Sequence, residues 1–455
     1  MSKSEKVWEQ FLDRDSVEDL VQLTRSKPDN EVSRRTFLEV LGYSSVALAM
    51  SGCRAPQQKI VPYLKQPVEF TPGVASWFSS GCGGCSRACG TLVKVRDGRP
   101  IKLEGNPDHP LSQGGLCALA HGMVFGLYDP DRLRQPLIAS QAATWNEIDQ
   151  KVIERLESIK KSGGKVRLLT PPLISPTSRE TTQKFLAQFS GKHITYQSVS
   201  QDAIRQAHLR SHGVEAIPQY KFADARLVVS FAADFLGTWI APVEFTRGYA
   251  NARSLQSEKR EMLRHIQFES RMSLTGSNAD RRVKLSPAEE SGALLYLAKL
   301  VAAASPAAPL TPALTGFEAT QLAEGARTAV DKTARELLQV QGQSLVLSGA
   351  NDVQTQYLVN FINQSLGNYG KTIDLNMASA MDHSSDTEMV ELVRQMNAGE
   401  IAALIVSGVN PAYDYFDGQS FIKGAKKVPL TVSLNSSLDE TSSLTEFVCP
   451  QPNFL

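Results

Sequence analysis

The sequence predicts an α/β protein in which a small β-rich domain with a group of cysteines precedes doubly wound α/β domains. Several short apolar runs, bounded by turn residues, alternate with segments of helix length, a pattern typical of parallel strands covered on both faces. Four of the six cysteines lie within residues 82–117, which indicates a metal or cluster site rather than scattered disulfides. The 455 residues suffice for two or three such domains.

The α/β part is predicted from five apolar runs, at residues 166–169, 227–231, 344–349, 403–408 and 430–432. Segments of helix length lie between several of them, for example at residues 180–189 and 355–366. A stretch rich in proline and alanine, residues 304–312, is predicted to be a surface connection. We therefore expect one α/β domain at residues 139–303 and a second at residues 313–455, with ligands at the carboxyl ends of their strands.

The composition is that of an ordinary globular protein, with 42% hydrophobic and 21% charged residues. The 48 lysines and arginines balance the 47 aspartates and glutamates, so the charge does not favour nucleic acid as a partner. No apolar run approaches 18 residues, so no transmembrane helix is predicted.

Residues 1–53 are predicted to form an export segment. Arg34 and Arg35 are followed by Phe37-Leu38 and a mildly apolar stretch at residues 40–50, which is the twin-arginine signature ahead of a short h-region. The alternative is an amphipathic helix that begins at Ser33 as its N-cap. The twin-arginine route carries folded proteins, so thiolate ligands would not pass unfolded into an oxidising compartment.

The apolar stretch ends in Ser51-Gly52-Cys53, which resembles a lipobox. We therefore expect a lipid on the Cys53 thiol, with the protein anchored at the periplasmic side of the inner membrane. The alternative is a plain small-residue cleavage site with an incidental cysteine.

Cys82, Cys85, Cys89 and Cys117 are the predicted ligands of one 4Fe–4S cluster, in a domain at residues 54–138. Such a cluster needs four thiolates, and three of them lie together in a glycine-rich loop. Alternating runs about Asp97-Gly98 predict a β-hairpin that returns the chain toward this loop, as a distant fourth ligand requires. Structural zinc and disulfides are the alternatives, although zinc more often uses two paired C-x2-C knuckles.

At these residues the sequence resembles the molybdopterin oxidoreductase family. The cysteine spacing matches the cluster motif of the family, and further similar segments follow in the same order, at residues 98–110, 127–133, 274–280, 408–411 and 439–444. The resemblance implies a cluster domain, doubly wound α/β domains and a C-terminal barrel domain. The chain stops at residues 449–455, so we expect the barrel domain to be missing and the second α/β domain to be truncated.

Two departures from the family bear on molybdenum. The family commonly has a lysine two residues after the fourth cysteine, where this chain has Leu119. Many members bind molybdenum through a thiolate or selenolate in the middle of the chain, but no cysteine lies between Cys117 and Cys449. Ser198, Ser200 and Asp202 lie near the expected region and are the remaining candidates for a ligand.

Within the family, the chain resembles most the periplasmic iron–sulfur subunit of alternative complex III. This resemblance implies an electron-transfer and scaffold subunit without molybdenum, with no catalytic residue of its own. The implied partners are a membrane-embedded quinol-oxidising subunit and other iron–sulfur or haem subunits. Two alternatives stay open, a catalytic bis-pterin molybdenum oxidoreductase of the sulfur-compound reductase type and a zinc-stabilised or cluster-free structural component. Whether the chain is an enzyme is therefore open.

Overall fold

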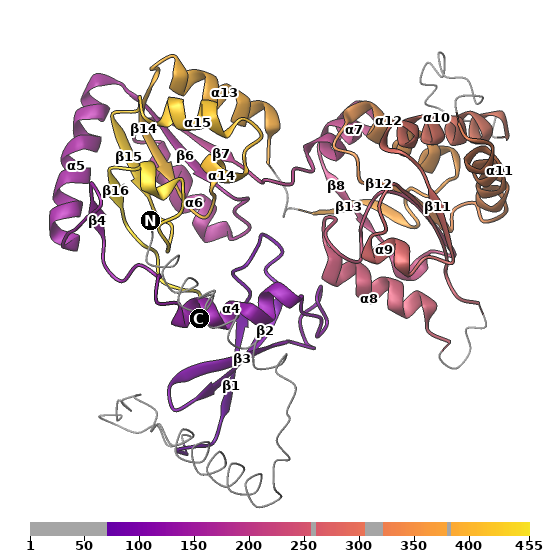
Figure 1. Cartoon of the computed structure of the whole chain (residues 1–455), viewed down its shortest axis with the longest axis horizontal. Helices are drawn as coiled ribbons and strands as arrows, with labels where there is room; N and C mark the ends of the chain where they lie inside the picture. Colours follow the sequence, from indigo (N-terminus) through magenta and orange to yellow (C-terminus); the bar gives the residue numbers. More distant parts are fainter. Residues whose placement is uncertain (1–70, 256–260, 305–321, 380–383) are drawn as a thin grey trace, which may run out of the picture. The chain divides into compact units, whose positions relative to one another are not determined.

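The computed structural model describes residues 71–255, 261–304, 322–379 and 384–455 (Figure 1). The predicted export segment with Arg34, Arg35 and Cys53 lies outside these residues, as does most of the predicted connection at 304–312. The strands of the described part form four sheets. No helix in it is both long and apolar enough to cross a membrane.

The first sheet is the predicted cysteine domain. Strands β1 (Ser76–Gly81), β2 (Gly90–Arg96) and β3 (Arg99–Gly105) are antiparallel in the order β1-β2-β3. The hairpin predicted about Asp97-Gly98 is confirmed, since both turn residues have positive φ angles, 49° and 75°. Helix α4 (Ala118–Tyr128) packs on β3, where His121 Nδ1 lies 2.9 Å from the Leu103 carbonyl oxygen.

The first α/β sheet has seven strands in the order β5-β4-β16-β15-β14-β6-β7. Its bounds are β4 Leu137–Ile138, β5 Gln141–Ala142, β6 Lys165–Thr170, β7 Ser190–Thr195, β14 Ile401–Val406, β15 Leu430–Ser433 and β16 Phe447–Val448. Strands β7, β6, β14, β15 and β16 are parallel.

Helices cover both faces of this sheet, as predicted. Buried residues of α5 (Trp145–Ser162) and α6 (Pro176–Leu186) belong to the core on one face. Those of α13 (Asp386–Asn397) and α15 (Gly418–Ala425) belong to the core on the other. The short α14 (Pro411–Asp414) and the 3-10 turn η3 (Ser442–Leu444) lie in the loops after β14 and β15.

The second α/β sheet is parallel throughout, with the order β11-β10-β9-β12. Its strands are β9 Leu227–Phe231, β10 Arg264–Glu269, β11 Arg281–Lys284 and β12 Ser344–Ser348, and a separate antiparallel pair is formed by β8 Ile217–Tyr220 and β13 Ile373–Ser379. Helices α7 (Asp202–His212), α8 (Pro242–Arg253), α9 (Leu274–Ser277), α10 (Pro287–Ala304), α11 (Glu324–Gln339) and α12 (Val353–Ser365) accompany them, with the 3-10 turn η1 (Phe222–Asp224).

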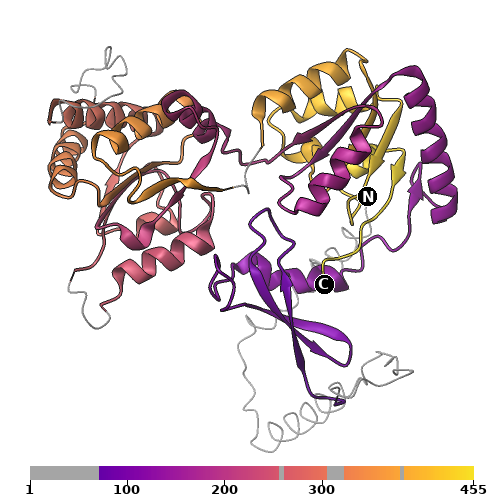
Figure 2. The ribbon, with the colours of Figure 1, turned by 180° about the vertical axis from the view of Figure 1, so that it is seen from behind.

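The two α/β sheets are interleaved along the chain. Strands β6 and β7 join β14, β15 and β16 in one sheet, and β9 to β12 form the other between them in sequence (Figure 2). The division predicted at residues 139–303 and 313–455 therefore does not follow the sheets. Apolar runs identify strands but do not show which strands are neighbours in a sheet, so the sequence alone did not predict this arrangement.

Candidate functional site

The four predicted cluster ligands come from two neighbouring segments of the cysteine domain. Cys82 directly follows β1, Cys85 and Cys89 lie in the loop to β2, and Cys117 is the N-cap residue of α4. The Cys82 amide donates a hydrogen bond to the Cys89 carbonyl oxygen at 2.8 Å, which closes the loop at its base.

The chain between β3 and α4 brings Cys117 back to this loop. The Asn106 amide donates to the Gly90 carbonyl oxygen, and the Gly114 amide donates to the Asn106 carbonyl oxygen, each at 2.9 Å. The backbone passes so close here that a Cβ on Gly105 would lie 2.2 Å from the Gly114 carbonyl oxygen. As predicted from the hairpin, the chain therefore returns to the cysteine loop.

Glycines form a cradle around the thiols. A Cβ on Gly84 would lie 2.5 Å from Met123 Sδ and 3.6 Å from Cys82 Sγ. A Cβ on Gly83 would lie 2.8 Å from the ring of Phe454. A side chain at either position would have to displace Met123 or the Phe454 ring, so the two glycines let these side chains lie against the cysteine loop.

The thiols share two cavities. Cys82, Cys85 and Cys117 line one of about 690 Å³ together with α4, and Cys85, Cys89 and Cys117 line a small apolar one of about 60 Å³. Burial raises the pKa of Cys82, and it raises the pKa of Cys89 to about 11, with a further rise from the other three thiols. Four thiolates in this space repel one another, so they require a cationic group between them.

This donor set fits a cluster better than a single metal ion. In the described residues, no three His, Cys, Asp or Glu side chains gather as ligands of one metal ion. A zinc ion needs four ligands about 2.3 Å away on one centre, whereas a 4Fe–4S cluster takes four thiolates around a larger body. The cavities that the thiols share agree with the predicted cluster.

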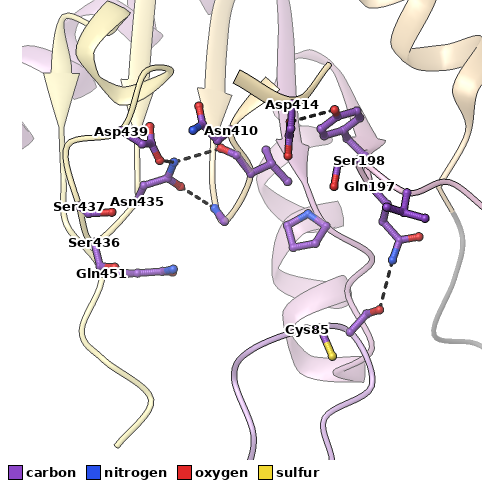
Figure 3. Close-up of a pocket in the computed structure, with 16 residues that line it drawn as sticks. Cys85, Gln197, Ser198, Asn410, Asp414, Asn435, Ser436, Ser437, Asp439 and Gln451 are labelled. Atoms are coloured by element: carbon purple, nitrogen blue, oxygen red, sulfur yellow. Dashed lines mark hydrogen bonds between the residues drawn. The ribbon is translucent and has the colours of Figure 1, made fainter. Parts of the chain in front are cut away.

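A third, polar cavity of about 510 Å³ adjoins the cysteine loop (Figure 3). It lies at the carboxyl ends of β6, β7, β14 and β15, where the strand order changes direction, and Cys85 and Ser86 line it from the cysteine domain. This is the position at which α/β sheets bind ligands. Its lining from the sheet comprises Pro171, Tyr196, Gln197, Ser198, Val199, Gly408, Val409, Asn410, Asp414, Asn435, Ser436, Ser437, Asp439 and Gln451.

Asn435 holds the loops of this cavity together. Its Oδ1 accepts a hydrogen bond from the Gly408 amide at 2.6 Å, and its Nδ2 donates to the Val409 carbonyl at 3.1 Å and to Asp439 Oδ2 at 2.8 Å. Gly408 has a φ of 69°, a conformation that favours glycine. The loops after β14 and β15 are thus fixed against each other before any ligand arrives.

Asp414 is an acid of the cavity whose pKa is shifted. Its Oδ1 accepts a hydrogen bond from the Tyr196 hydroxyl at 2.9 Å, and burial raises the pKa of the Asp414 carboxyl. Among the described lining residues, Asp414 and Asp439 are the charged groups and none is Lys, Arg or His. The cavity therefore presents negative charge and hydrogen-bonding groups, but no cation to neutralise an anionic ligand.

The three candidate molybdenum ligands have different positions. Ser198 lines the polar cavity. Asp202 is buried beside Arg205 and accepts a hydrogen bond from the Asp386 amide at 3.2 Å. Ser200 accepts a hydrogen bond from the Asp202 amide at 3.1 Å. The structure therefore places Ser198 in the cavity, while the polar groups of the other two bind the protein itself.

At the second sheet, acidic side chains are bound by their own loops. Glu269, at the end of β10, accepts hydrogen bonds from the amide and hydroxyl of Ser273 at 3.1 and 2.6 Å. Asp234, after β9, accepts from the amide and hydroxyl of Thr275 at 3.1 and 2.7 Å. These carboxylates therefore stabilise the loops and are not directed at a ligand.

Sequence reasoning found part of the polar cavity. The segments 408–411 and 439–444 were identified by resemblance, and Gly408, Val409, Asn410 and Asp439 do line it. It missed Tyr196, Asp414 and Asn435. The available signal was that Tyr196 directly follows β7 and Asn435 lies two residues after β15, where ligand-binding residues of α/β sheets gather.

Comparison with known proteins identifies the cysteine domain. Residues 75–128 match the family model of the molybdopterin oxidoreductase Fe4S4 domain. The predicted resemblance to the molybdopterin oxidoreductases is thus confirmed, and a 4Fe–4S cluster is supported.

Two relatives extend beyond the Fe4S4 domain. The menaquinone reductase molybdopterin-binding-like subunit of Nitratidesulfovibrio vulgaris is 26% identical over 92% of this chain and 65% of its own length. The arsenate respiratory reductase molybdopterin-containing subunit ArrA of Shewanella sp. is 23% identical over 60% of this chain and 33% of its own length. The chain thus spans less than two thirds of either relative.

A solved structure supports the fold. Acetylene hydratase from Pelobacter acetylenicus superposes with a TM-score of 0.65 at 13% sequence identity, covering 83% of this chain and 63% of the hydratase. The predicted arrangement, an Fe4S4 domain followed by α/β layers of the molybdopterin enzyme type, is thereby confirmed.

Proposed function

We propose that this chain is the iron–sulfur electron-transfer and scaffold subunit of a membrane-attached respiratory complex that oxidises quinol, and that it works without molybdenum. One observation carries the proposal. The Fe4S4 domain gathers four thiols, whereas the adjoining cavity has two carboxylates and, among its described lining residues, no cation. The similarity to a menaquinone reductase subunit supports the respiratory setting.

Cys82, Cys85, Cys89 and Cys117 would hold the cluster, which when bound supplies reversible one-electron transfer. The chain's own part is to fix the thiolates. The hydrogen bond between Cys82 and Cys89 closes their loop, Met123 Sδ lies 3.9 Å from Cys82 Sγ, and α4 begins at Cys117. A rigid loop lowers the reorganisation that accompanies a change of charge.

A molybdenum–pterin cofactor fits the polar cavity poorly. Its nucleotide form carries phosphate groups, and these are normally bound by cations or helix N-termini. Asp414 and Asp439 would oppose such a charge. The lysine and middle-domain thiolate common in the family are also absent from the sequence.

The location and partners belong to the same proposal. Export through Arg34 and Arg35, with a lipid on Cys53, would place the chain at the periplasmic side of the inner membrane. There it would meet a membrane-embedded quinol-oxidising subunit and further iron–sulfur or haem subunits, and pass electrons among them.

Metal analysis and low-temperature EPR on the anaerobically purified whole chain test the proposal. We expect about four irons per chain, a reducible cluster signal and no molybdenum. Cys89→Ser should lose most of the iron, while Cys449→Ser, the matched control outside the domain, should keep it. Stoichiometric molybdenum or tungsten would overturn the scaffold role, and zinc without iron would overturn the cluster.

The second candidate is a catalytic bis-pterin molybdenum oxidoreductase. The cavity of about 510 Å³ beside Cys85 favours it, because Ser198 offers a hydroxyl there. If Ser198 bound molybdenum, Ser198→Ala would lose the metal while keeping four irons. Ser437→Ala, in the same cavity, is the control.

A further inference from the structure

The four predicted cluster ligands differ in their access to solvent. Cys82 is buried, with 8% of its surface exposed, Cys89 and Cys117 are partly buried, and Cys85 is exposed. Cys85 lines the polar cavity of about 510 Å³, the cavity of about 690 Å³ along α4 and the small apolar one. Each of the other three cysteines lines at most two of these cavities.

The surroundings of Cys82 and Cys85 explain this contrast. Cys82 is covered by Met123, and its backbone is tied to Cys89. Cys85 lies across the polar cavity from the loop after β15, where Ser436 and Ser437 line both larger cavities with it (Figure 3). The two larger cavities therefore adjoin each other at the Cys85 thiol.

We propose that Cys85 is the exchangeable ligand of the cluster, so that a small thiol from solvent can replace it on its iron. The inference rests on the proposed cluster. The polar cavity of about 510 Å³, which Cys85 lines and the other three cysteines do not, lies within the size range that accommodates small organic ligands, so a thiol of a few atoms has room there. Cys82 does not line this cavity, it is buried, and Met123 Sδ lies 3.9 Å from its Sγ.

The exchange is balanced without an oxidant or reductant. The incoming thiol gives up its proton, and its sulfur bonds to the iron. The Cys85 sulfur leaves that iron and takes up one proton, so the net charge and the electron count of the site are unchanged. Only access to the iron distinguishes Cys85 from the other ligands.

Chemical rescue tests the inference in the whole chain, prepared anaerobically with and without 2-mercaptoethanol. We expect Cys85→Gly to be short of iron without the thiol and to return to the wild-type iron content and EPR signal with it. Cys82→Gly, the matched control, should stay deficient under both conditions. Rescue of both variants, or of neither, would overturn the proposal.

A second measurement uses the wild-type protein and does not depend on how the variants fold. A fluorinated small thiol added to the cluster-loaded chain should give a paramagnetically shifted 19F resonance. If the wild type contains a cluster but binds no thiol, the inference on Cys85 fails and the proposed function stands. If the wild type contains no cluster, the proposed function itself fails.

Discussion

Gly90 and His109 show how little space surrounds the cluster loop at the level of single residues. Gly90 follows Cys89, and a Cβ at this position would lie 2.5 Å from His109 Cβ and 2.6 Å from its Cγ. The imidazole cannot easily move aside, since its Nδ1 lies 2.9 Å from Ser112 Oγ and accepts a hydrogen bond from the Ser112 amide at 3.2 Å. The path of the loop next to a predicted ligand thus depends on a missing side chain.

We expect Gly90→Ala to lower the iron content of the chain, because the added methyl group would displace Cys89 or the His109 ring. The measurement is iron per chain after anaerobic reconstitution. Gly122→Ala on α4 is the matched control, since a Cβ there meets no atom within 4 Å. The control should keep its iron and gain about 0.5–1 kcal/mol of stability. A wild-type iron content in Gly90→Ala would contradict this prediction and show that the loop can accommodate the methyl group.

His208 gives a prediction for pH dependence. It is buried in α7, where its Nδ1 lies 2.8 Å from the Ile204 carbonyl oxygen and its Nε2 lies 3.1 Å from the Tyr369 hydroxyl. Burial lowers its pKa from 6.5 to about 4, with a smaller contribution from His212. The native state therefore holds a neutral imidazole, while the unfolded chain takes up a proton below pH 6.5.

The stabilisation is complete above the unfolded pKa and is lost as the pH falls from 6.5 toward 4. At 1.36 kcal/mol per pKa unit, the full effect is about 3 kcal/mol. Urea unfolding at about pH 7 and about pH 4.5 should show a smaller loss for His208→Gln than for the wild type. If both proteins lost the same unfolding free energy between the two pH values, His208 would not be a source of the acid sensitivity.

Among the site residues, the sequence identified those that are close together in the chain. The cysteines carry their own signal, because their spacing and the turn at Asp97-Gly98 are local. Tyr196, Asp414 and Asn435 form no such local motif, and the signal for Tyr196 and Asn435 is only their position after a strand. They meet because β7, β14 and β15 end at the same edge of one sheet.

Helix α5 is capped at both ends. Of its 18 residues, Ile148 is the one fully buried in the core. At its start, the Thr144 hydroxyl accepts a hydrogen bond from the Glu147 amide at 3.3 Å, and the Thr144 amide donates to Glu147 Oε2 at 2.8 Å. This is a capping box, and Gly163 ends the helix with a φ of 70°.

Thr144→Ala should cost about 1 kcal/mol of unfolding free energy, because the Glu147 amide loses its acceptor and Glu147 Oε2 loses the hydroxyl that donates to it. Thr144→Ser keeps the hydroxyl and should retain most of the stability. Chemical denaturation of both variants measures the difference. If alanine and serine behave alike, the side-chain cap does not contribute.

The strands that the sequence predicted differ chemically from those it missed. β9 and β14 are continuous apolar runs and were predicted. β10 was missed, although its last five residues are buried, because His265, Gln267 and Glu269 alternate with apolar residues. These polar groups satisfy one another, with His265 Nε2 3.1 Å from Gln267 Oε1 and Gln267 Nε2 donating to Glu269 Oε2 at 3.2 Å. In a sequence, polar residues that alternate with apolar ones indicate a strand with one face in solvent, even where those polar residues are in fact buried.

Over the described chain as a whole, the second α/β sheet is inserted into the first. The chain leaves the first sheet after β7 and returns at α13. The two crossing points are adjacent, because the Ser385 amide donates a hydrogen bond to the Thr195 carbonyl oxygen at 3.4 Å. Because the two ends of the inserted segment are close together, the segment can be removed without separating the strands of the first sheet.

We expect a chain in which residues 197–383 are replaced by a short glycine–serine linker to keep the first sheet folded. Circular dichroism and a cooperative thermal transition would establish this. As the control, a chain divided between residues 303 and 313 separates β6 from β14 and β9 from β12, and its fragments should not fold. Folding of the divided fragments, and not of the excised chain, would contradict the interleaved arrangement.

The pairing of β6 with β14 also sets the order in which the chain can fold on the ribosome. Lys165 in β6 bonds to Glu400 just before β14, 235 positions later. At about 5–20 residues per second, translation needs roughly 10 to 50 s to cover that stretch. During that time the apolar residues of β6 have no partner on one side, while the inserted unit can already fold. The nascent protein is therefore most exposed to aggregation, and most in need of a chaperone, after β7 has emerged and before β14 has been made.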